Sequence, residues 1–184
     1  MRHPDIFAAI LVGGRGSRMG GADKARLREG DRTFVERLVA ALAPVVAEVV
    51  LCGRAEQDYP ETGCRLIADR HQGVGPLGGL EAALAAAPVP WCFLVACDMP
   101  AVDGEVLDRL AAQRQPNLQV VVPRTARLEP ACALYHVDAL TAVRAALARC
   151  SHALHHLVAA LPHVEVAFEA DLAARLRNVN RTGD

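Results

Sequence analysis

The chain has 184 residues, of which 52% are hydrophobic and 22% charged, and its formal net charge at pH 7 is −1. This composition suits a single globular domain spanning residues 1–184 and excludes a disordered or fibrous chain. Because a near-zero charge supplies no long-range field, we expect no nucleic-acid or membrane partner, and any anion binding must be local.

Apolar segments of strand length alternate with segments of helical period, which predicts an α/β fold with a mainly parallel sheet. In chain order, the predicted strands are 6–12, 48–52, 64–68, 91–96, 118–123, 131–136 and 163–168. The predicted helices are 33–42, 79–86, 104–113, 137–148 and 151–161. Thr33 with Glu36 three residues later, and Asp103 before a Glu-bearing first turn, are helix start signals.

The cysteines and the N-terminal segment indicate a reducing compartment. The longest early apolar run is about seven residues, too short for a signal-peptide core or a membrane span, so we expect a cytoplasmic protein. The six cysteines form no C-x-x-C pair, which argues against zinc or a disulfide framework and predicts mostly buried thiols. Their positions are 52, 64, 92, 97, 132 and 150.

A glycine-rich segment follows the first predicted strand, with glycines at 13, 14, 16, 20 and 21. It does not fit the dinucleotide fingerprint, because Met19 stands where G-x-G-x-x-G needs its last glycine. It does not fit a Walker loop, because Ala22 rather than Lys follows Gly21. The segment nevertheless lies where ligands bind in open α/β sheets, and Arg15, Arg18 and Lys24 would supply cationic donors there. The alternative is a solvated surface loop.

Asp98 follows the predicted strand 91–96 and precedes Pro100. A lone carboxylate at a strand end is often a turn residue or a helix cap. Beside a phosphate loop it also suits Mg²⁺, which takes one or two carboxylates, waters and substrate phosphates. Cys97, next to Asp98, is a candidate nucleophile by position.

Three further features are weaker taken alone. Asp69 and the glycines of the loop 73–79 would allow close approach to a base or a sugar, or would serve as a cap and a turn. Asn178 and Asn180 alternate along an extended C-terminal segment. His152, His155 and His156 have helical spacing, and we interpret them as a solvated or half-buried helix face rather than a metal site.

Taken in order, these segments resemble the molybdenum cofactor guanylyltransferases, the MobA type of nucleotidyltransferase. The family pattern L-A-G-G-x-x-x-R-M-G-G-x-D-K is similar to residues 11–24, G-P-L-x-G-L to 75–80, C-D-x-P to 97–100 and N-V-N to 178–180. The segment 129–135 also resembles the family's central strand. The likeness covers nearly the whole chain.

The resemblance implies a Rossmann-like three-layer sandwich with a mainly parallel mixed sheet, as in the nucleotide-diphospho-sugar transferases. It implies transfer of GMP from GTP to the terminal phosphate of molybdopterin, the organic part of the molybdenum cofactor, with release of pyrophosphate and with Mg²⁺ as cofactor. An attack between two anions calls for charge neutralisation and positioning more than for a nucleophilic side chain.

The resemblance also implies residue roles. The nucleotide would contact Leu11, Val12, Gly13, Gly14, Lys24, Asp69, Gly78 and Asp98. The catalytic residues would be Arg18 and Lys24 at the triphosphate and Asp98 at Mg²⁺. The acceptor would contact Asn178 and Asn180.

Three departures from the family pattern bear on specificity. Val12 replaces the usual Ala, Cys52 stands where some members have a nucleotide-contacting Asn, and the tail reads N-V-N-R-T-G-D. Gly14 favours a guanylyltransferase over a cytidylyltransferase for the same acceptor, since that group tends to carry L-A-A-G. Another small-molecule nucleotidyltransferase and a non-catalytic GTP-binding adaptor are the remaining alternatives, and transient contact with cofactor-delivery proteins is compatible with each.

Overall fold

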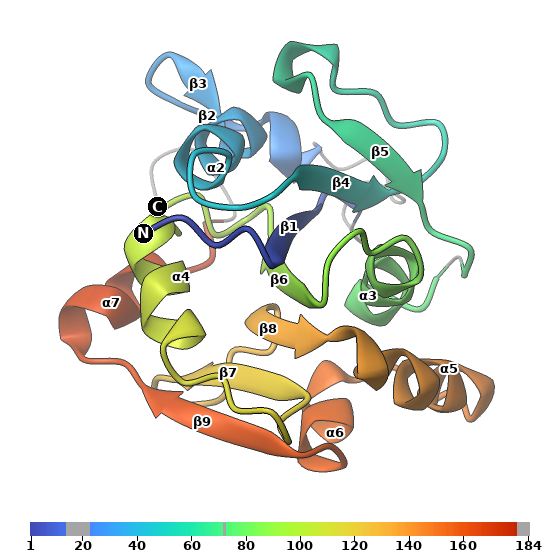
Figure 1. The fold of residues 1–184 in the computed structure, drawn as a ribbon. Coiled ribbons are helices and arrows are strands. Elements are labelled where there is room, and N and C mark those ends of the chain that lie inside the picture. The colour runs from blue at the N-terminus through green and yellow to red at the C-terminus, as the bar shows by residue number, and fades with distance from the viewer. Residues whose placement is uncertain (14–22, 72, 180–184) are drawn as a thin grey trace.

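The computed structural model describes residues 1–13, 23–71 and 73–179, and its main feature is a seven-stranded sheet in the order β5-β4-β1-β6-β8-β7-β9 (Figure 1). The strands are β1 Ile6–Leu11, β4 Val49–Gly53, β5 Arg65–Ala68, β6 Trp91–Ala96, β7 Val120–Arg124, β8 Cys132–His136 and β9 His163–Ala167. β8 runs antiparallel to β6 and β7, and the other neighbouring strands are parallel.

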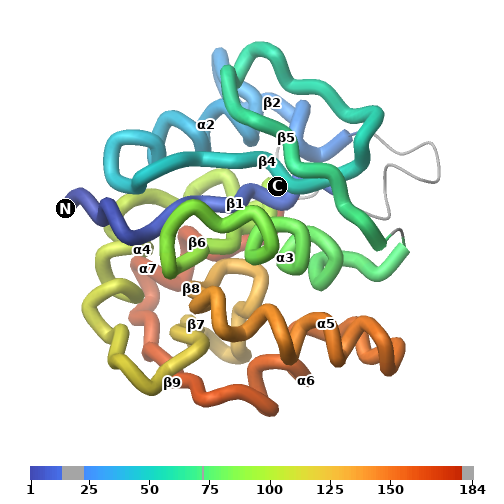
Figure 2. The backbone as a smooth tube through the Cα atoms, turned by 45° about the vertical axis from the view of Figure 1, so that its right-hand side comes forward, coloured from blue at the N-terminus to red at the C-terminus, as the bar shows by residue number. Residues whose placement is uncertain are grey.

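Helices cover both faces of this sheet, which makes a three-layer sandwich (Figures 1 and 2). They are α2 Phe34–Leu42, α3 Pro76–Ala85, α4 Gly104–Ala111, α5 Leu140–Ala148, α6 Leu154–Ala159 and α7 Ala170–Arg175. One apolar cluster lies between the sheet and α2, α4 and α7, and the other between the sheet and α3, α5 and α6. Alternate residues of β1 enter the two clusters, as the two-residue period of a strand requires.

The predicted mixed α/β sandwich is confirmed, and each sheet strand lies within two residues of its predicted bounds. The helix start at Thr33 is confirmed by a capping box, in which Thr33 N donates to Glu36 Oε2 at 2.7 Å and Glu36 N donates to Thr33 Oγ1 at 3.3 Å. Asp103 caps α4 by accepting from Glu105 N and Val106 N at 3.1 and 3.2 Å.

Some helix bounds were wrong. The helix predicted to begin at residue 79 begins at Pro76, whose fixed φ suits the first turn. The helix predicted over 137–148 is a short 3-10 turn, η3 Val137–Ala139, followed by α5, and the one predicted over 151–161 is the shorter α6.

Five short elements were not predicted: the hairpin strands β2 Arg28–Glu29 and β3 Arg32–Thr33, the 3-10 turns η1 Lys24–Arg26 and η2 Pro60–Thr62, and α7. The hairpin turns at Gly30, whose φ is +66°. Each of these elements has at most six residues, too few to display a period.

Candidate active site

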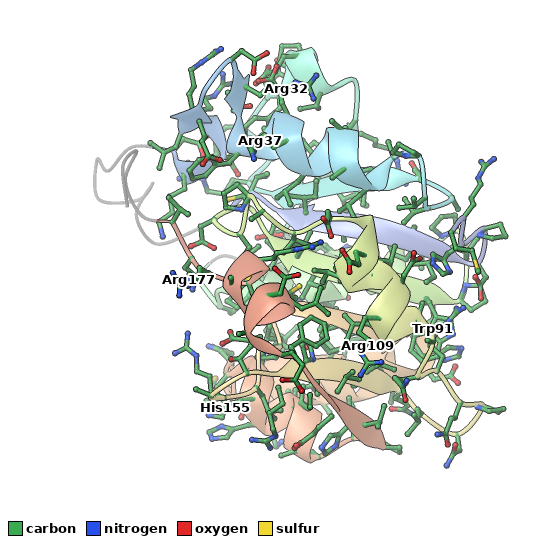
Figure 3. All side chains as sticks on the ribbon, turned by 90° about the vertical axis from the view of Figure 1, so that its left-hand side faces the viewer. Arg32, Arg37, Trp91, Arg109, His155 and Arg177 are labelled. Carbon is green, nitrogen blue, oxygen red and sulfur yellow. The ribbon has the colours of Figure 1, made fainter. Side chains whose placement is uncertain are left out.

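A cavity of about 940 Å³ opens at the edge of the sheet where the parallel strands end. Its walls come from the segments that follow β1 and β6, from the segment between β7 and β8, from α6 and from the C-terminal segment. Figure 3 shows His155 of α6 and Arg177 on one side of the molecule and Trp91, the first residue of β6, on the other side. The cavity therefore lies at the carboxyl end of β6, as expected for ligand sites in open α/β sheets.

The first and third sequence motifs meet because β1 and β6 are neighbours in the sheet. Leu11 pairs with Ala96 in the parallel register, and Cys97 N donates to Leu11 O at 3.0 Å. Leu11, Val12 and Gly13 all line the cavity, as does Asp98. The sheet register therefore brings the start of the glycine segment, Leu11 to Gly13, and the Asp98 carboxylate to one place.

Lys24 and Asp98 form an ion pair inside this cavity. Lys24 Nζ lies 2.9 Å from Asp98 Oδ2, and the side chains are 38% and 20% exposed. Lys24 is held by the turn η1, which Asp23 caps by accepting from Ala25 N at 3.1 Å. Partial burial of this pair keeps both charges oriented while leaving them accessible to a ligand.

The C-terminal segment joins the same site. Val179 N donates to Asp98 O at 2.8 Å, and the preceding residue, Asn178, lines the cavity. The N-V-N and C-D-x-P motifs, 80 residues apart in sequence, are thus in direct contact through the backbone.

Asp69 lies beside the glycines rather than among the described residues that line the cavity. Asp69 N donates to Gly53 O at 2.7 Å, which extends the pairing of β4 and β5 by one residue. A Cβ built on Gly13 would lie 3.7 Å from Asp69 Oδ2, and one on Gly79 would lie 3.6 Å from Asp69 Oδ1.

Glycine is required at positions 78 and 79. A side chain at Gly79 would place its Cβ 2.4 Å from Leu11 Cδ2, and one at Gly78 would place its Cβ 3.1 Å from His71 O. Gly79 therefore lets the start of α3 pack closely on the end of β1, and Gly78 lets it pass close to the preceding loop. A Cβ on Gly78 would lie 4.0 Å from Asp69 Oδ2, and neither residue is among the described residues that line the cavity.

Three predicted site residues, Gly14, Arg18 and Asn180, lie outside the described residues, as does Arg15. Of the other predicted residues, the structure brings six to the cavity wall. They are Leu11, Val12, Gly13, Lys24, Asp98 and Asn178.

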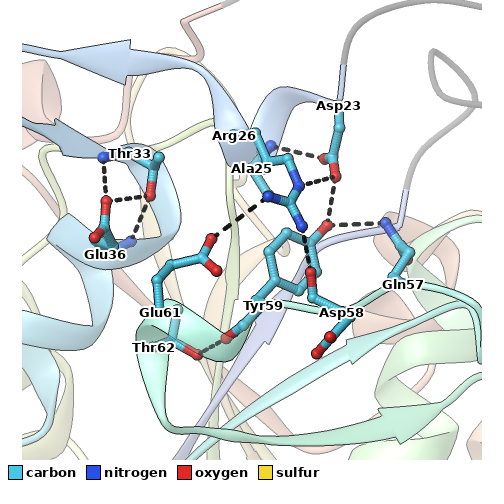
Figure 4. A network of polar contacts seen from close by, with 10 residues as sticks. All are labelled: Asp23, Ala25, Arg26, Thr33, Glu36, Gln57, Asp58, Tyr59, Glu61 and Thr62. Carbon is cyan, nitrogen blue, oxygen red and sulfur yellow. Dashed lines mark hydrogen bonds and ion pairs between the residues drawn. The ribbon is translucent and has the colours of Figure 1, made fainter.

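A chain of hydrogen bonds behind the site, not expected from the sequence, links the end of β1 to η1 (Figure 4). Gln57 Nε2 donates to Val12 O at 3.1 Å and to the Tyr59 hydroxyl at 2.9 Å. The Tyr59 hydroxyl donates to Asp23 Oδ2 at 2.7 Å. Burial, together with the bond to Asp23, raises the pKa of Tyr59, so the hydroxyl stays protonated and keeps donating. This chain fixes Val12 and the turn that carries Lys24 relative to each other.

The segment between β7 and β8 forms the opposite wall and was also missed as a site. Arg124, Arg127 and Glu129 line the cavity there, and His155 of α6 joins them. Tyr135, fully buried, anchors the segment by donating from its hydroxyl to Pro130 O at 2.7 Å. The sequence offered one signal for this segment, namely its position. It follows a strand whose carboxyl end lies at the same edge of the sheet.

Cys97 is a poor nucleophile despite its place next to Asp98. Burial, followed by the negative charge of Asp98, raises the pKa of the Cys97 thiol to about 12. The thiolate needed for attack is therefore scarce at neutral pH. Four of the six cysteines are buried, Cys64 is intermediate and Cys150 is exposed, and all six are free thiols.

The donors in the cavity fit Mg²⁺ held together with a substrate. Among the described residues, no group of three or more His, Cys, Asp or Glu side chains is placed to hold a metal ion. Asp98 offers one partly exposed carboxylate, which is enough for Mg²⁺ when waters and phosphates complete its shell. His155 and His156 are exposed on α6, with ring centroids 4.2 Å apart.

None of the described helices has the length and apolar character needed to cross a membrane.

Comparison with known proteins places this fold and site among nucleotidyltransferases. The sequence model of the MobA-like NTP transferase domain matches residues 8–166. A probable molybdenum cofactor guanylyltransferase of Opitutus terrae is 35% identical over 187 aligned positions, covering 97% of this chain and 92% of that protein. A probable molybdenum cofactor guanylyltransferase of Clostridium perfringens is 35% identical over 129 residues, and the match covers 70% of this chain but only 64% of the relative.

A solved structure supports the same grouping. The molybdopterin-guanine dinucleotide biosynthesis protein A of Archaeoglobus fulgidus aligns with a TM-score of 0.80 and 25% sequence identity. The alignment covers 96% of this chain and 93% of that one.

Proposed function

This chain belongs to the MobA-like NTP transferase family, and from this we propose that it transfers GMP from GTP to molybdopterin. The observation that carries the proposal is the Lys24–Asp98 pair, 2.9 Å apart in a cavity that also contains Leu11, Gly13 and Asn178. The relatives named as molybdenum cofactor guanylyltransferases support the choice of substrates.

The proposed reaction needs positioning and charge neutralisation. A terminal phosphate oxygen of the acceptor attacks the α-phosphorus of GTP and forms a new P–O bond. The bond between that phosphorus and the oxygen bridging to the β-phosphorus breaks, and its electron pair leaves with pyrophosphate. No protein side chain becomes covalently attached, in keeping with the high pKa of Cys97 and the absence of any need for a thiolate.

Lys24 and Asp98 would have different electrostatic roles. The Lys24 ammonium would neutralise phosphate oxygens of GTP, as would the Arg18 side chain that the family resemblance assigns to the triphosphate. Asp98 would hold Mg²⁺. When bound there, Mg²⁺ would supply positive charge that offsets the charge developing on the leaving pyrophosphate.

The nucleoside would lie at the end of β1. Leu11, Val12 and Gly13 form the cavity wall there, next to Asp69 and Gly78, and Gly14 follows directly in the sequence. Gly13 passes close to Gly53, since a Cβ on Gly13 would lie 3.4 Å from Gly53 Cα. Such a bare backbone suits a base or ribose packed against the strand end.

The test is product formation from each of the four nucleoside triphosphates with molybdopterin supplied. We expect the guanine dinucleotide from GTP and little product from CTP, ATP or UTP. Robust product from CTP with none from GTP would instead assign a cytidylyltransferase. GTP binding that ignores Mg²⁺ and releases no pyrophosphate would assign a non-catalytic adaptor. Contact with cofactor-delivery proteins is compatible with the proposal and would be sought by co-purification.

A further inference from the structure

The cavity has a second wall, formed by the segment between β7 and β8, to which the proposed function assigns no part of the nucleotide. The cavity volume of about 940 Å³ lies at the upper end of the range of roughly 300–1,000 Å³ for small-molecule pockets. In the sheet order, β6 with Asp98 at its end stands between β1, β4 and β5 on one side and β8, β7 and β9 on the other. A second ligand beyond Asp98 would therefore lie against the segment between β7 and β8.

Glu129 is the acidic side chain of this second wall. It lines the cavity, and its side chain is only 13% exposed. Arg127 Nε donates to Glu129 Oε1 at 3.1 Å, and Thr125 Oγ1 donates to the same oxygen at 3.3 Å. Both hydrogen bonds that the described residues donate to this carboxylate end on Oε1. Oε2 can therefore accept a hydrogen bond from a ligand.

The backbone around Glu129 is rigidly held. Glu129 N donates to Pro123 O at 3.0 Å, and Cys132 N donates to Glu129 O at 2.9 Å. The Tyr135 hydroxyl fixes the next residue through Pro130 O. A carboxylate on a segment tied to both neighbouring strands is pre-organised for a directional contact.

Apolar residues also line this cavity, beside the charged Arg124, Arg127 and Glu129 of the same segment. The apolar residues are Pro76, Met99, Ala126, Leu128, Pro130 and Ala131. A flat, bicyclic ring packs well against such a surface, and a single carboxylate at its edge selects a ring that presents two adjacent N–H donors.

We propose that Glu129 recognises the 2-amino-4-oxo edge of the pterin ring of the acceptor. The ring's N3–H and 2-amino group are two parallel donors, the arrangement that a carboxylate accepts in a bidentate manner. The inference rests on the proposed function for the identity of the acceptor. The guanine of GTP has the same pair of donors, but the proposed function puts guanine at the end of β1, and β6 with Asp98 separates β1 from β8 and β7 in the sheet.

The experiment compares wild type, Glu129→Gln and Glu165→Gln. Glu165 is the matched control, because it is also paired to an arginine, Arg124, and is not among the described residues that line the cavity. We expect Glu129→Gln to raise the KM for molybdopterin about tenfold or more through loss of a charge-assisted pair. Both variants should keep the wild-type Kd for GTP, which also shows that they are folded.

Binding of free pterin and of lumazine, which has a carbonyl in place of the 2-amino group, provides a readout apart from turnover. Wild type and Glu165→Gln should bind pterin more tightly than lumazine, and Glu129→Gln should lose that preference. A wild-type protein without the preference, or a Glu129→Gln variant that keeps it, overturns the inference. A weakened Kd for GTP in Glu129→Gln would assign the carboxylate to guanine and overturn it as well.

Failure of the proposed function gives a different result. If wild type forms no product from GTP and molybdopterin, the proposed reaction is wrong whatever the pterin titration shows. If wild type forms product and Glu129→Gln has an unchanged KM for molybdopterin, the inference on Glu129 alone is wrong.

Discussion

Lys24 Nζ lies 2.9 Å from Asp98 Oδ2, although 74 residues separate the two in the chain. The pair forms because β1 and β6 are neighbours in a parallel register, so the segments that leave them emerge at one edge of the sheet. Each charge stabilises the other in the partly buried cavity. A triphosphate with Mg²⁺ offers a new partner to both, a negative one to the lysine and a positive one to the aspartate.

Asp98→Ala should lower kcat/KM for the proposed GMP transfer about 100-fold or more, because the carboxylate proposed to hold Mg²⁺ is lost. Cys97→Ser should keep most activity, since the thiol is protonated and takes no part. Initial rates of pyrophosphate release, measured over a range of Mg²⁺ concentrations, compare the two. A Cys97→Ser variant that is less active than Asp98→Ala would contradict the metal assignment.

Lys24→Ala should lower kcat/KM for GTP by roughly 10²–10³, because it removes the cation proposed to neutralise the GTP phosphates. Lys24→Arg should be more active than Lys24→Ala and less active than wild type. The guanidinium keeps the positive charge but lacks the compact geometry of the ammonium. The exposed Arg32 supplies a control, and Arg32→Ala should behave as wild type. Equal activity of Lys24→Ala and Arg32→Ala would remove Lys24 from the mechanism.

Tyr59→Phe should destabilise the protein by about 1–3 kcal/mol because the Asp23 carboxylate and the Gln57 amide both lose a buried partner. It should also weaken GTP binding, since Asp23 caps the turn that carries Lys24. Tyr135→Phe is the matched control: it removes a buried hydroxyl from the opposite wall and should leave GTP affinity intact. Urea unfolding and GTP titration of both variants test this, and identical GTP affinities in the two would refute a positioning role for Tyr59.

Arg144→Ala should lower the free energy of unfolding without changing kcat. Arg144 Nε donates to Glu81 Oε1 at 2.9 Å, and the Glu81 side chain is only 2% exposed between α3 and α5. Removing the guanidinium leaves a buried carboxylate without its cation, although Arg144 is 53% exposed and water replaces part of the interaction. We expect a loss of about 1–3 kcal/mol by thermal or urea unfolding. A stable but inactive variant would show that this pair acts on the active site.

Alkylation should distinguish the cysteines by their surroundings. Burial raises the pKa of Cys97 to about 12 from an ordinary value of 9.0, so the folded protein retains this proton at pH 8. As pH rises above about 9, the unfolded chain ionises at this thiol while the folded state does not, so this group favours unfolding progressively up to about pH 12. At pH 8, mass spectrometry should find iodoacetamide on the exposed Cys150 well before Cys97. Comparable labelling of both would show that Cys97 is accessible and ionised.

The sequence predicts most of the fold because its central strands are strongly apolar. All six residues of β1 are buried, and such a run is recognisable without any partner. The antiparallel direction of β8 could not be predicted from the sequence. The pairing of β6 with β8, such as Trp91 with His136, depends on the path of the chain and not on the local residue pattern. The six-residue α7 was missed for lack of a period.

That six of the named residues meet at one cavity could be expected for a similar reason. Asp98 and the glycine segment were placed at one sheet edge by strand polarity alone, and Asn178 by family resemblance. Gln57 and Tyr59 were missed because their bonds to Val12 and Asp23 span 45 and 36 residues and no motif marks them. Glu129 was noticed only as part of a strand-like segment, since its burial depends on Thr125 and Arg127 in the folded loop.

The most direct measurement follows two labels of GTP in the presence of molybdopterin and Mg²⁺. With ³²P at the α-position, wild type should transfer the label to the pterin product, and Asp98→Ala should not. With ³²P at the γ-position, all released label should appear in pyrophosphate. Label from the γ-position in the pterin product, or α-label released as free GMP without transfer, would contradict a guanylyltransferase built on Lys24 and Asp98.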